Sequence, residues 1–205
     1  MKKGLTEIVC IIDRSGSMNG IKKEAEGSFN SFIEKQKKEP GEAMVTLAQF
    51  DGEYEILHDG TNIKDVGKYE LLPRGMTALL DGIGKTVNTV GDRLSKTDES
   101  EKPENVVVCI VTDGGENASR EFKPDDIKKI IETQEKEYSW EFIFLAANQD
   151  AFDTAQGLGI KMRNTTNFNP TGKGVQAAYA TMDTFTSNLR SGVKGHALDD
   201  ATKQE

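Results

Sequence analysis

Three oxygen-bearing side chains follow directly after an apolar run near the start of the chain. The run is Ile8-Val9-Cys10-Ile11-Ile12, and the residues after it are Asp13-Arg14-Ser15-Gly16-Ser17. Because Asp13, Ser15 and Ser17 alternate, an extended loop would direct all three side chains toward one side. One carboxylate and two hydroxyls grouped in this way could bind a hard cation through oxygen. The sequence therefore predicts a metal site where a buried strand runs out into a loop.

Two later segments carry the groups that would complete such a site. Thr77 lies in Arg74-Gly75-Met76-Thr77-Ala78-Leu79, and Asp113 lies in Val111-Thr112-Asp113-Gly114-Gly115-Glu116-Asn117. Mg²⁺ suits a donor set with few carboxylates because it keeps several waters, and Mn²⁺ accepts similar ligands. Ca²⁺ usually takes more ligands and more charge. Five candidate ligands for the six positions of an octahedral cation leave room for water or for an oxygen atom of a partner.

Alternating strand and helix patterns predict the elements that must position these residues. We expect strands at Glu7–Asp13, Ala43–Phe50, Asn105–Asp113 and Glu141–Ala147, and a last strand near Ile160–Thr165. Apolar residues at helical spacing predict helices over Ile21–Ile33, Leu79–Leu94, Ile127–Ile131, Ala151–Leu158 and Val175–Leu189. Asp51-Gly52 separates two alternating stretches and indicates a hairpin. The prediction is an α/β fold: a doubly wound, mostly parallel sheet with one antiparallel edge strand and helices on both faces.

This fold predicts that the candidate ligands meet. In open parallel sheets, sites form beyond the carboxyl ends of the strands. Asp13 and Asp113 both end predicted strands, so we expect them at the same edge of the sheet. Thr77 opens a predicted helix above that edge, where its hydroxyl could also serve as the helix N-cap.

Composition sets the limits on organisation and partners. The 205 residues predict one domain over residues 1–190, followed by a polar, disordered tail over residues 191–205. The net charge of −8 argues against nucleic acid or an anionic membrane surface as the partner. No signal-like segment opens the chain and no apolar run approaches the roughly 20 residues that span a bilayer, so we expect a cytoplasmic protein. The placement of the two histidines and two cysteines makes zinc binding and Ser-His-Asp chemistry poor interpretations.

At the three polar segments the chain resembles the von Willebrand factor A (vWA) domain family. The metal-ion-dependent adhesion site of that family is written Asp-x-Ser-x-Ser, then Thr, then Asp, and all five positions are present here: Asp13, Ser15, Ser17, Thr77 and Asp113. The resemblance spans roughly residues 5–190 and is to the compact, single-domain type found in bacteria. It implies that Ser15, Ser17 and Thr77 contact the metal, and that Asp13 and Asp113 act directly or through water. It also implies that a Glu or Asp of a partner protein supplies the remaining ligand.

The interpretation that follows is a non-enzymatic binding module. Mg²⁺, with Mn²⁺ or Ca²⁺ as alternatives, would be held at the carboxyl edge of the sheet and would bind an acidic side chain of another protein, within an intracellular assembly. Asn148, Gln149 and Asp150 follow a predicted strand at the same edge, where they could line the partner surface or form an ordinary polar loop. The sequence does not indicate the oligomeric state.

Two other functions are compatible with parts of the pattern. One is a Mg²⁺-dependent phosphoryl-transfer enzyme with Asp13 as nucleophile. The haloacid-dehalogenase-like phosphatases that begin in this way need a second acid two residues on, and that position is Ser15 here. The other is a degenerate, metal-free scaffold, against which the five intact ligand positions speak.

Overall fold

A six-stranded sheet runs through the centre of the structure, a computed structural model that describes residues 1–147 and 150–193. The strands lie in the order β3-β2-β1-β4-β5-β6. All neighbours pair in parallel except β2 and β3, which are antiparallel, so the predicted fold class is confirmed. The strands are β1 (Lys2–Asp13), β2 (Glu42–Phe50), β3 (Tyr54–Asn62), β4 (Pro103–Thr112), β5 (Glu141–Ala146) and β6 (Thr165–Asn167).

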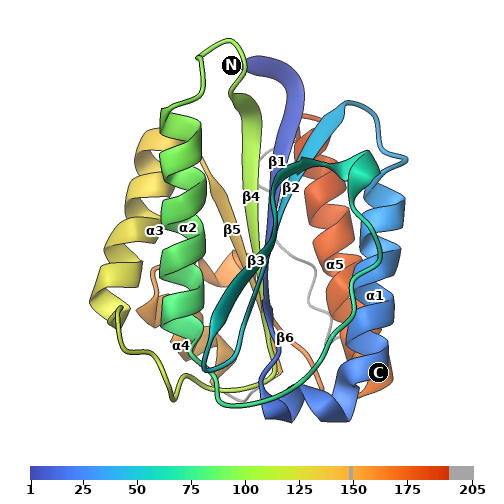
Figure 1. Cartoon of the computed structure of the whole chain (residues 1–205), viewed down its shortest axis with the longest axis vertical. Helices are drawn as coiled ribbons and strands as arrows, with labels where there is room; N and C mark the ends of the chain where they lie inside the picture. The colour runs from blue at the N-terminus through green and yellow to red at the C-terminus, as the bar shows by residue number, and fades with distance from the viewer. Residues whose placement is uncertain (148–149, 194–205) are drawn as a thin grey trace.

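Helices cover both faces of this sheet (Figure 1). On one face lie α1 (Lys22–Gln36) and α5 (Gly172–Arg190). On the other face lie α2 (Leu79–Ser95), α3 (Pro124–Tyr138) and α4 (Ala151–Gly157). Three short 3₁₀ helices complete the structure: η1 (Gly16–Ile21), η2 (Ile63–Asp65) and η3 (Met162–Asn164). No helix in the described ranges combines the length and apolar character that crossing a membrane requires.

Burial on both faces explains why the central strands read as continuous apolar runs. Along β1, Ile8, Cys10 and Ile12 belong to the cluster under α1 and α5, while Val9 and Ile11 belong to the cluster under α2 and α3. Burying one such aliphatic side chain stabilises a fold by roughly 1.5–3 kcal/mol. Cys10 pairs in register with Cys109 of β4, and both are buried free thiols.

The predicted last strand near Ile160–Thr165 is wrong in its position. Gly159 has a φ of 83° just beyond α4, and the N–H of Ile160 donates to the carbonyl of Ala155 at 2.9 Å. Ile160 is therefore an apolar contact of the helix end, buried in the cluster under α3. The chain then forms η3 before β6 begins at Thr165.

Parts of two predictions lie outside the described residues. Beyond Val193 the predicted polar tail is not described, and neither are Asn148 and Gln149. Asp150 is described, and it lies in an exposed turn just before α4.

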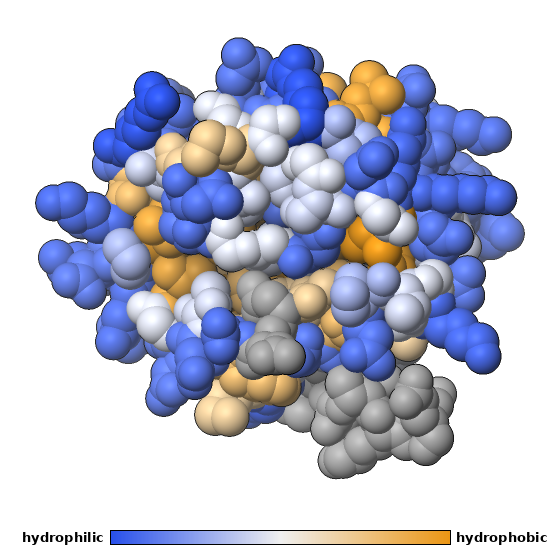
Figure 2. Space-filling view, turned by 90° about the horizontal axis from the view of Figure 1, so that it is seen from below, coloured by the Kyte–Doolittle hydropathy of each residue, from blue (hydrophilic) through white to orange (hydrophobic). Residues whose placement is uncertain are grey.

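The parallel strands end together at the lower edge of Figure 1, where the loops that follow β1 and β4 lie side by side. Figure 2 views the molecule from this edge and shows a mainly hydrophilic surface with smaller apolar patches. Leu72 and Met76, in the loop between β3 and α2, are exposed apolar residues.

Candidate metal centre

Asp13 ties the end of β1 to the end of β4. Its side chain is 0% exposed, and both of its oxygens accept hydrogen bonds. The N–H of Ser15 donates to Oδ1 at 2.6 Å, and the hydroxyl of Thr112 donates to Oδ2 at 2.6 Å. The carboxylate is thus fixed between two loops, with no open face toward solvent.

The two serines and Asp113 form a line of contacts that starts beside Asp13. The Oγ atoms of Ser15 and Ser17 are 3.0 Å apart, and the hydroxyl of Ser17 donates to Oδ1 of Asp113 at 2.6 Å. Ser15 is buried, Asp113 is half-buried and Ser17 is exposed. The set therefore runs from the interior of the sheet edge to its surface.

Thr77 lies beside this line, but it is not the N-cap of α2 as the sequence suggested. The helix begins at Leu79, with Ala78 in the cap position. The N–H of Thr77 donates to Oδ1 of Asn117 at 2.9 Å, and the N–H of Asn117 donates back to the Thr77 carbonyl at 3.0 Å. Glu116 takes over part of the capping, because its carboxylate accepts the N–H of Leu80 at 2.9 Å. The Thr77 hydroxyl is therefore not required by the helix.

Oxygen atoms from the first two polar segments converge on Gly114, which lies in the third. A Cβ atom built on this glycine would lie 3.3 Å from Oγ of Ser17, 3.3 Å from Oγ1 of Thr77 and 3.9 Å from Oδ2 of Asp13. With the contacts of Ser15 and Asp113, the structure thus brings all five sequence-predicted residues to one edge of the sheet.

Gly114→Ala should weaken metal binding at this centre by about tenfold, in the range found when groups that orient ligands are changed. The new methyl group would come within 3.3 Å of two hydroxyl oxygens and displace them. Gly115→Ala is the matched control, because its Cβ would have no neighbour within 4 Å. Calorimetric titration with Mg²⁺ measures the effect, and equal affinities for the two variants would contradict it.

The electrostatics of the centre favour a cation. Burial raises the pKa of Asp13 to about 6, against the hydrogen bonds from Thr112 and Ser15, and the charge of Asp113 acts in the same direction as burial. Burial also raises the pKa of Asp113, against the hydrogen bond from Ser17. Within residues 1–147 and 150–193, no ion pair involves either carboxylate. A bound cation would stabilise both charged forms, so the donor set fits a divalent metal.

The donor set is rich in hydroxyls and not in the usual metal-binding side chains. In the described part of the chain, no group of three or more His, Cys, Asp or Glu residues could hold an ion. Two carboxylates with three hydroxyls correspond to a hard, oxygen-preferring cation such as Mg²⁺. The same set disfavours softer metals that prefer thiolate or imidazole.

A second group of charged residues holds the loops of the centre together. Asp51 in the β2–β3 turn forms ion pairs with Arg14 at 3.1 Å and with Arg74 at 2.8 Å. Arg14 lies between the candidate ligands of the first loop, and Arg74 lies in the loop of Thr77. The backbone reinforces this arrangement, because the N–H of Arg74 donates to the Arg14 carbonyl and the N–H of Ala78 donates to the Asp51 carbonyl, both at 2.8 Å. The sequence pattern at Asp51-Gly52 predicts the hairpin but not these ion pairs.

Asp81 anchors the segment that follows Asp113. Its carboxylate accepts the N–H groups of Arg120, Glu121 and Phe122 at 2.9–3.0 Å. Burial acts to raise the pKa of Asp81, but these three donors outweigh it, and the pKa is lowered. The first turn of α2 is thereby joined to the loop that carries Glu116 and Asn117.

Asp81→Asn should lower the free energy of unfolding by roughly 1 kcal/mol near neutral pH, because the amide cannot serve all three donors. A lowered pKa in the folded state adds stability above the unfolded value of about 3.9, and this is lost as the pH falls through the folded value. The difference from wild type should therefore be constant from pH 7 to 5 and shrink below about pH 4. Urea unfolding at several pH values measures it, with Asp125→Asn as the control. A difference independent of pH would contradict this account.

Comparison with known proteins relates this arrangement to solved structures. No protein-family model matches the chain, and no curated protein matches it. A structure of proximal thread matrix protein 1 from the mussel byssus superposes with a TM-score of 0.65 at 13% identity, over 91% of this chain and 47% of that one. A von Willebrand factor type A structure from Catenulispora acidiphila gives 0.59 at 11% identity, over 91% and 43%.

The chain has the fold of a vWA domain. A second structure of the mussel protein has a TM-score of 0.61 at 13% identity, over 87% of this chain and 47% of that one, and its metal-ion-dependent adhesion site is occupied by zinc. This chain spans less than half the length of these solved structures. Sequence identities of 11–13% establish a shared fold and not a shared function.

Proposed function

We propose that this vWA-fold domain is a metal-dependent protein-binding module. Ser15, Ser17 and Thr77 would contact Mg²⁺, and Asp13 and Asp113 would supply the negative charge. The observation that carries the proposal is the line of contacts from Asp13 through Ser15 and Ser17 to Asp113, beside which the Thr77 hydroxyl lies. The zinc-occupied adhesion site of the mussel protein supports a divalent metal at this place in the fold.

The burial of the five residues indicates where a partner would bind. Asp13 and Ser15 lie inside the sheet edge, whereas Ser17 is exposed and Asp113 is half-buried. The five donors would leave one position of an octahedral cation open, and a Glu or Asp side chain of the partner would bind there through a charge-assisted contact. The exposed Leu72 and Met76 add apolar surface on the loop that carries Thr77. The net charge of −8 would slow the approach of an acidic partner without opposing the local contact.

The geometry does not favour the phosphoryl-transfer alternative. A nucleophilic Asp13 would need an oxygen that is open to substrate, yet the side chain is 0% exposed and both of its oxygens accept hydrogen bonds. We therefore propose a non-enzymatic module. A cytoplasmic assembly in a bacterium is the setting that we propose for it.

Calorimetry and affinity capture test the function together. We expect saturable Mg²⁺ binding, with Mn²⁺ similar and Ca²⁺ weaker, and a partner that is retained in Mg²⁺ and released in EDTA. Ser15→Ala/Ser17→Ala should lose both properties. Ser28→Ala/Ser31→Ala, on α1, is the matched control and should retain them. Partner binding that persists in EDTA and in the first variant would overturn the proposal and favour a metal-free scaffold.

A further inference from the structure

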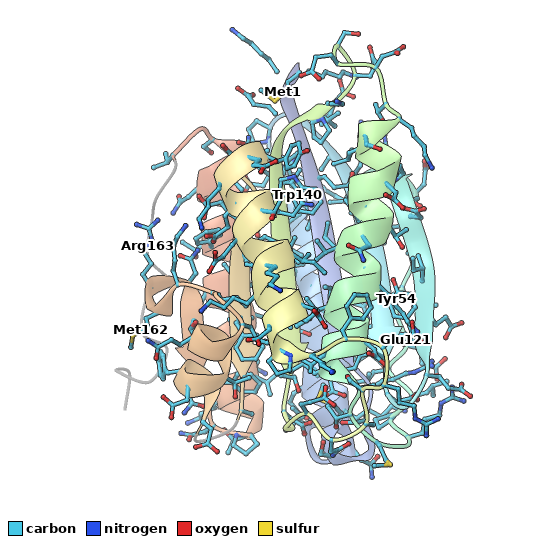
Figure 3. The ribbon with its side chains drawn as sticks, turned by 90° about the vertical axis from the view of Figure 1, so that its left-hand side faces the viewer. Met1, Tyr54, Glu121, Trp140, Met162 and Arg163 are labelled. Carbon is cyan, nitrogen blue, oxygen red and sulfur yellow. The ribbon has the colours of Figure 1, made fainter. Side chains whose placement is uncertain are left out.

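A second candidate binding site lies at the opposite end of the sheet. It is a cavity of about 630 Å³ between the C-terminal ends of α2 and α3, next to the start of β4, and we call it the α2–α3 cavity. Its apolar lining includes Leu94, Pro103, Val106, Tyr138 and Trp140. Figure 3 shows Trp140 toward the end of the domain that carries Met1, away from Tyr54 and Glu121. The volume is in the range of ligand-binding pockets.

Trp140 gives the cavity a hydrogen-bond donor without an acceptor. The side chain is 5% exposed, and its ring stacks on Phe142 with the centroids 6.3 Å apart. Its indole N–H has no hydrogen-bond partner among the described residues, and the nitrogen keeps some exposure to solvent. Because Trp140 lines the cavity, its indole N–H is available as a candidate donor to a ligand bound there. Buried Trp N–H groups normally find a partner, so this donor would be satisfied by an acceptor atom of a ligand.

The rim of the cavity is strongly acidic. Its lining contains four carboxylates and two cationic groups: Asp92, Glu99, Glu104, Glu137, the side chain of Lys102 and the N-terminal ammonium of Met1, which lies 3.8 Å from Glu99. Lys102 pairs with Glu99 at 3.0 Å, and Glu104 accepts the N–H of Gly4 at 2.8 Å. Asp92 and Glu137 are exposed and form no ion pair with any described residue. One lies on α2 and the other on α3, so both walls present an uncompensated charge.

The helix ends add to this negative potential. Both α2 and α3 end at the cavity, at Ser95 and Tyr138, and the C-terminal end of a helix carries a partial negative charge. Tyr138 is 62% exposed and offers an aromatic face beside the carboxylates. The cavity thus combines an apolar floor, an aromatic wall, the indole N–H of Trp140, which is unpaired among the described residues, and an acidic rim.

We propose that the α2–α3 cavity binds a basic peptide segment of a partner protein. A cationic side chain would lie between Asp92 and Glu137, and a backbone carbonyl of the peptide would accept the indole N–H of Trp140. A peptide fits better than a free cation, because a cation alone offers that donor no acceptor. Trp, Tyr and Arg are enriched at protein interfaces, and the cavity offers the first two to an arginine of the partner. This site is separate from the metal centre and does not depend on it.

The single tryptophan of the chain makes this proposal directly measurable. The full chain is titrated in EDTA with a capped Gly-Arg-Gly-Arg-Gly peptide, and tryptophan fluorescence reports on the cavity. We expect a saturable change that is absent with the Gly-Gln-Gly-Gln-Gly peptide. Asp92→Asn/Glu137→Gln should raise the Kd at least fivefold. Asp65→Asn/Glu70→Gln removes the same two charges elsewhere on the surface and should leave the Kd within twofold.

Trp140→Phe tests the donor, because it keeps an aromatic ring and removes the N–H. Calorimetry should show about a threefold or larger rise in the Kd for the arginine peptide. Three results would overturn the proposal: no saturable signal, equal weakening by the two charge-removing double variants, or methylguanidinium, a cation without a carbonyl group, binding as tightly as the peptide. The second result would indicate general attraction to an acidic protein, and the third would indicate a site for a small cation.

Discussion

Replacing Asp13 by asparagine should reduce Mg²⁺ affinity by about 100-fold or more while the domain stays folded. The amide has nearly the same shape, so its oxygen can accept the N–H of Ser15 and its NH₂ can donate to Oγ1 of Thr112. The Thr112 hydroxyl would then donate to the Gly114 carbonyl, which is already 3.1 Å away. The substitution would remove one of the two carboxylates while keeping a hydrogen bond to Ser15 and one to Thr112. Calorimetric titration with Mg²⁺ and thermal unfolding measure the two properties separately.

Two further variants separate the loss of metal binding from a loss of stability. Asp13→Ala should also lose the metal, but with a loss of stability of roughly 1–3 kcal/mol, because the buried Ser15 N–H loses its acceptor. Asp98→Asn, at an exposed position, should change neither property. Metal affinity retained in Asp13→Asn would contradict the assignment of this carboxylate to the site.

Removing the charge of Asp51 should have the largest effect on stability outside the hydrophobic core. Asp51→Asn should lower the free energy of unfolding by roughly 2–3 kcal/mol, because the buried Arg14 loses its partner and keeps only Glu55. Mg²⁺ affinity should fall as well, since the loops of Ser15 and Thr77 are joined through this residue. Urea unfolding followed by metal titration measures both effects.

Glu53→Gln is the control for Asp51, because it removes another carboxylate from Arg74, at an exposed position. We expect stability and metal affinity close to wild type for this variant. An equal loss in the two variants would show that Arg74, and not the buried contact with Arg14, determines the stability of the loops. A loss of stability in Asp51→Asn without loss of metal affinity would show that the loops keep their places without the ion pairs.

The fold was predictable because its dominant signals are local. Strands buried on both faces read as continuous apolar runs, and the helices have clear apolar stripes. The rule that parallel strands end at one edge was then enough to place Asp13 and Asp113 together. The exception near Ile160 arises because an apolar residue after a short helix gives the same local pattern whether it opens a strand or packs against the helix end.

The supporting contacts of the centre were not predictable in the same way. Thr77 followed by an apolar stripe is the usual pattern of an N-cap, but Glu116 and Asn117, about 40 residues away, satisfy the backbone groups that a cap would serve. Asp51 followed by glycine reads as a turn, and its arginine partners are 23 and 37 residues away. Side-chain contacts over such distances leave no periodic signal in the sequence.

Strand β4 sets the separation between the two ends of the domain. Pro103 at its start lines the α2–α3 cavity, and Thr112 at its end holds Asp13 of the metal centre. Its ten residues span about 33 Å at roughly 3.3 Å per residue. One extended peptide would need about ten residues to reach both sites, whereas two shorter segments on different proteins would be held apart at a fixed spacing. The domain would then hold two partners at a fixed distance and raise the effective concentration of one near the other.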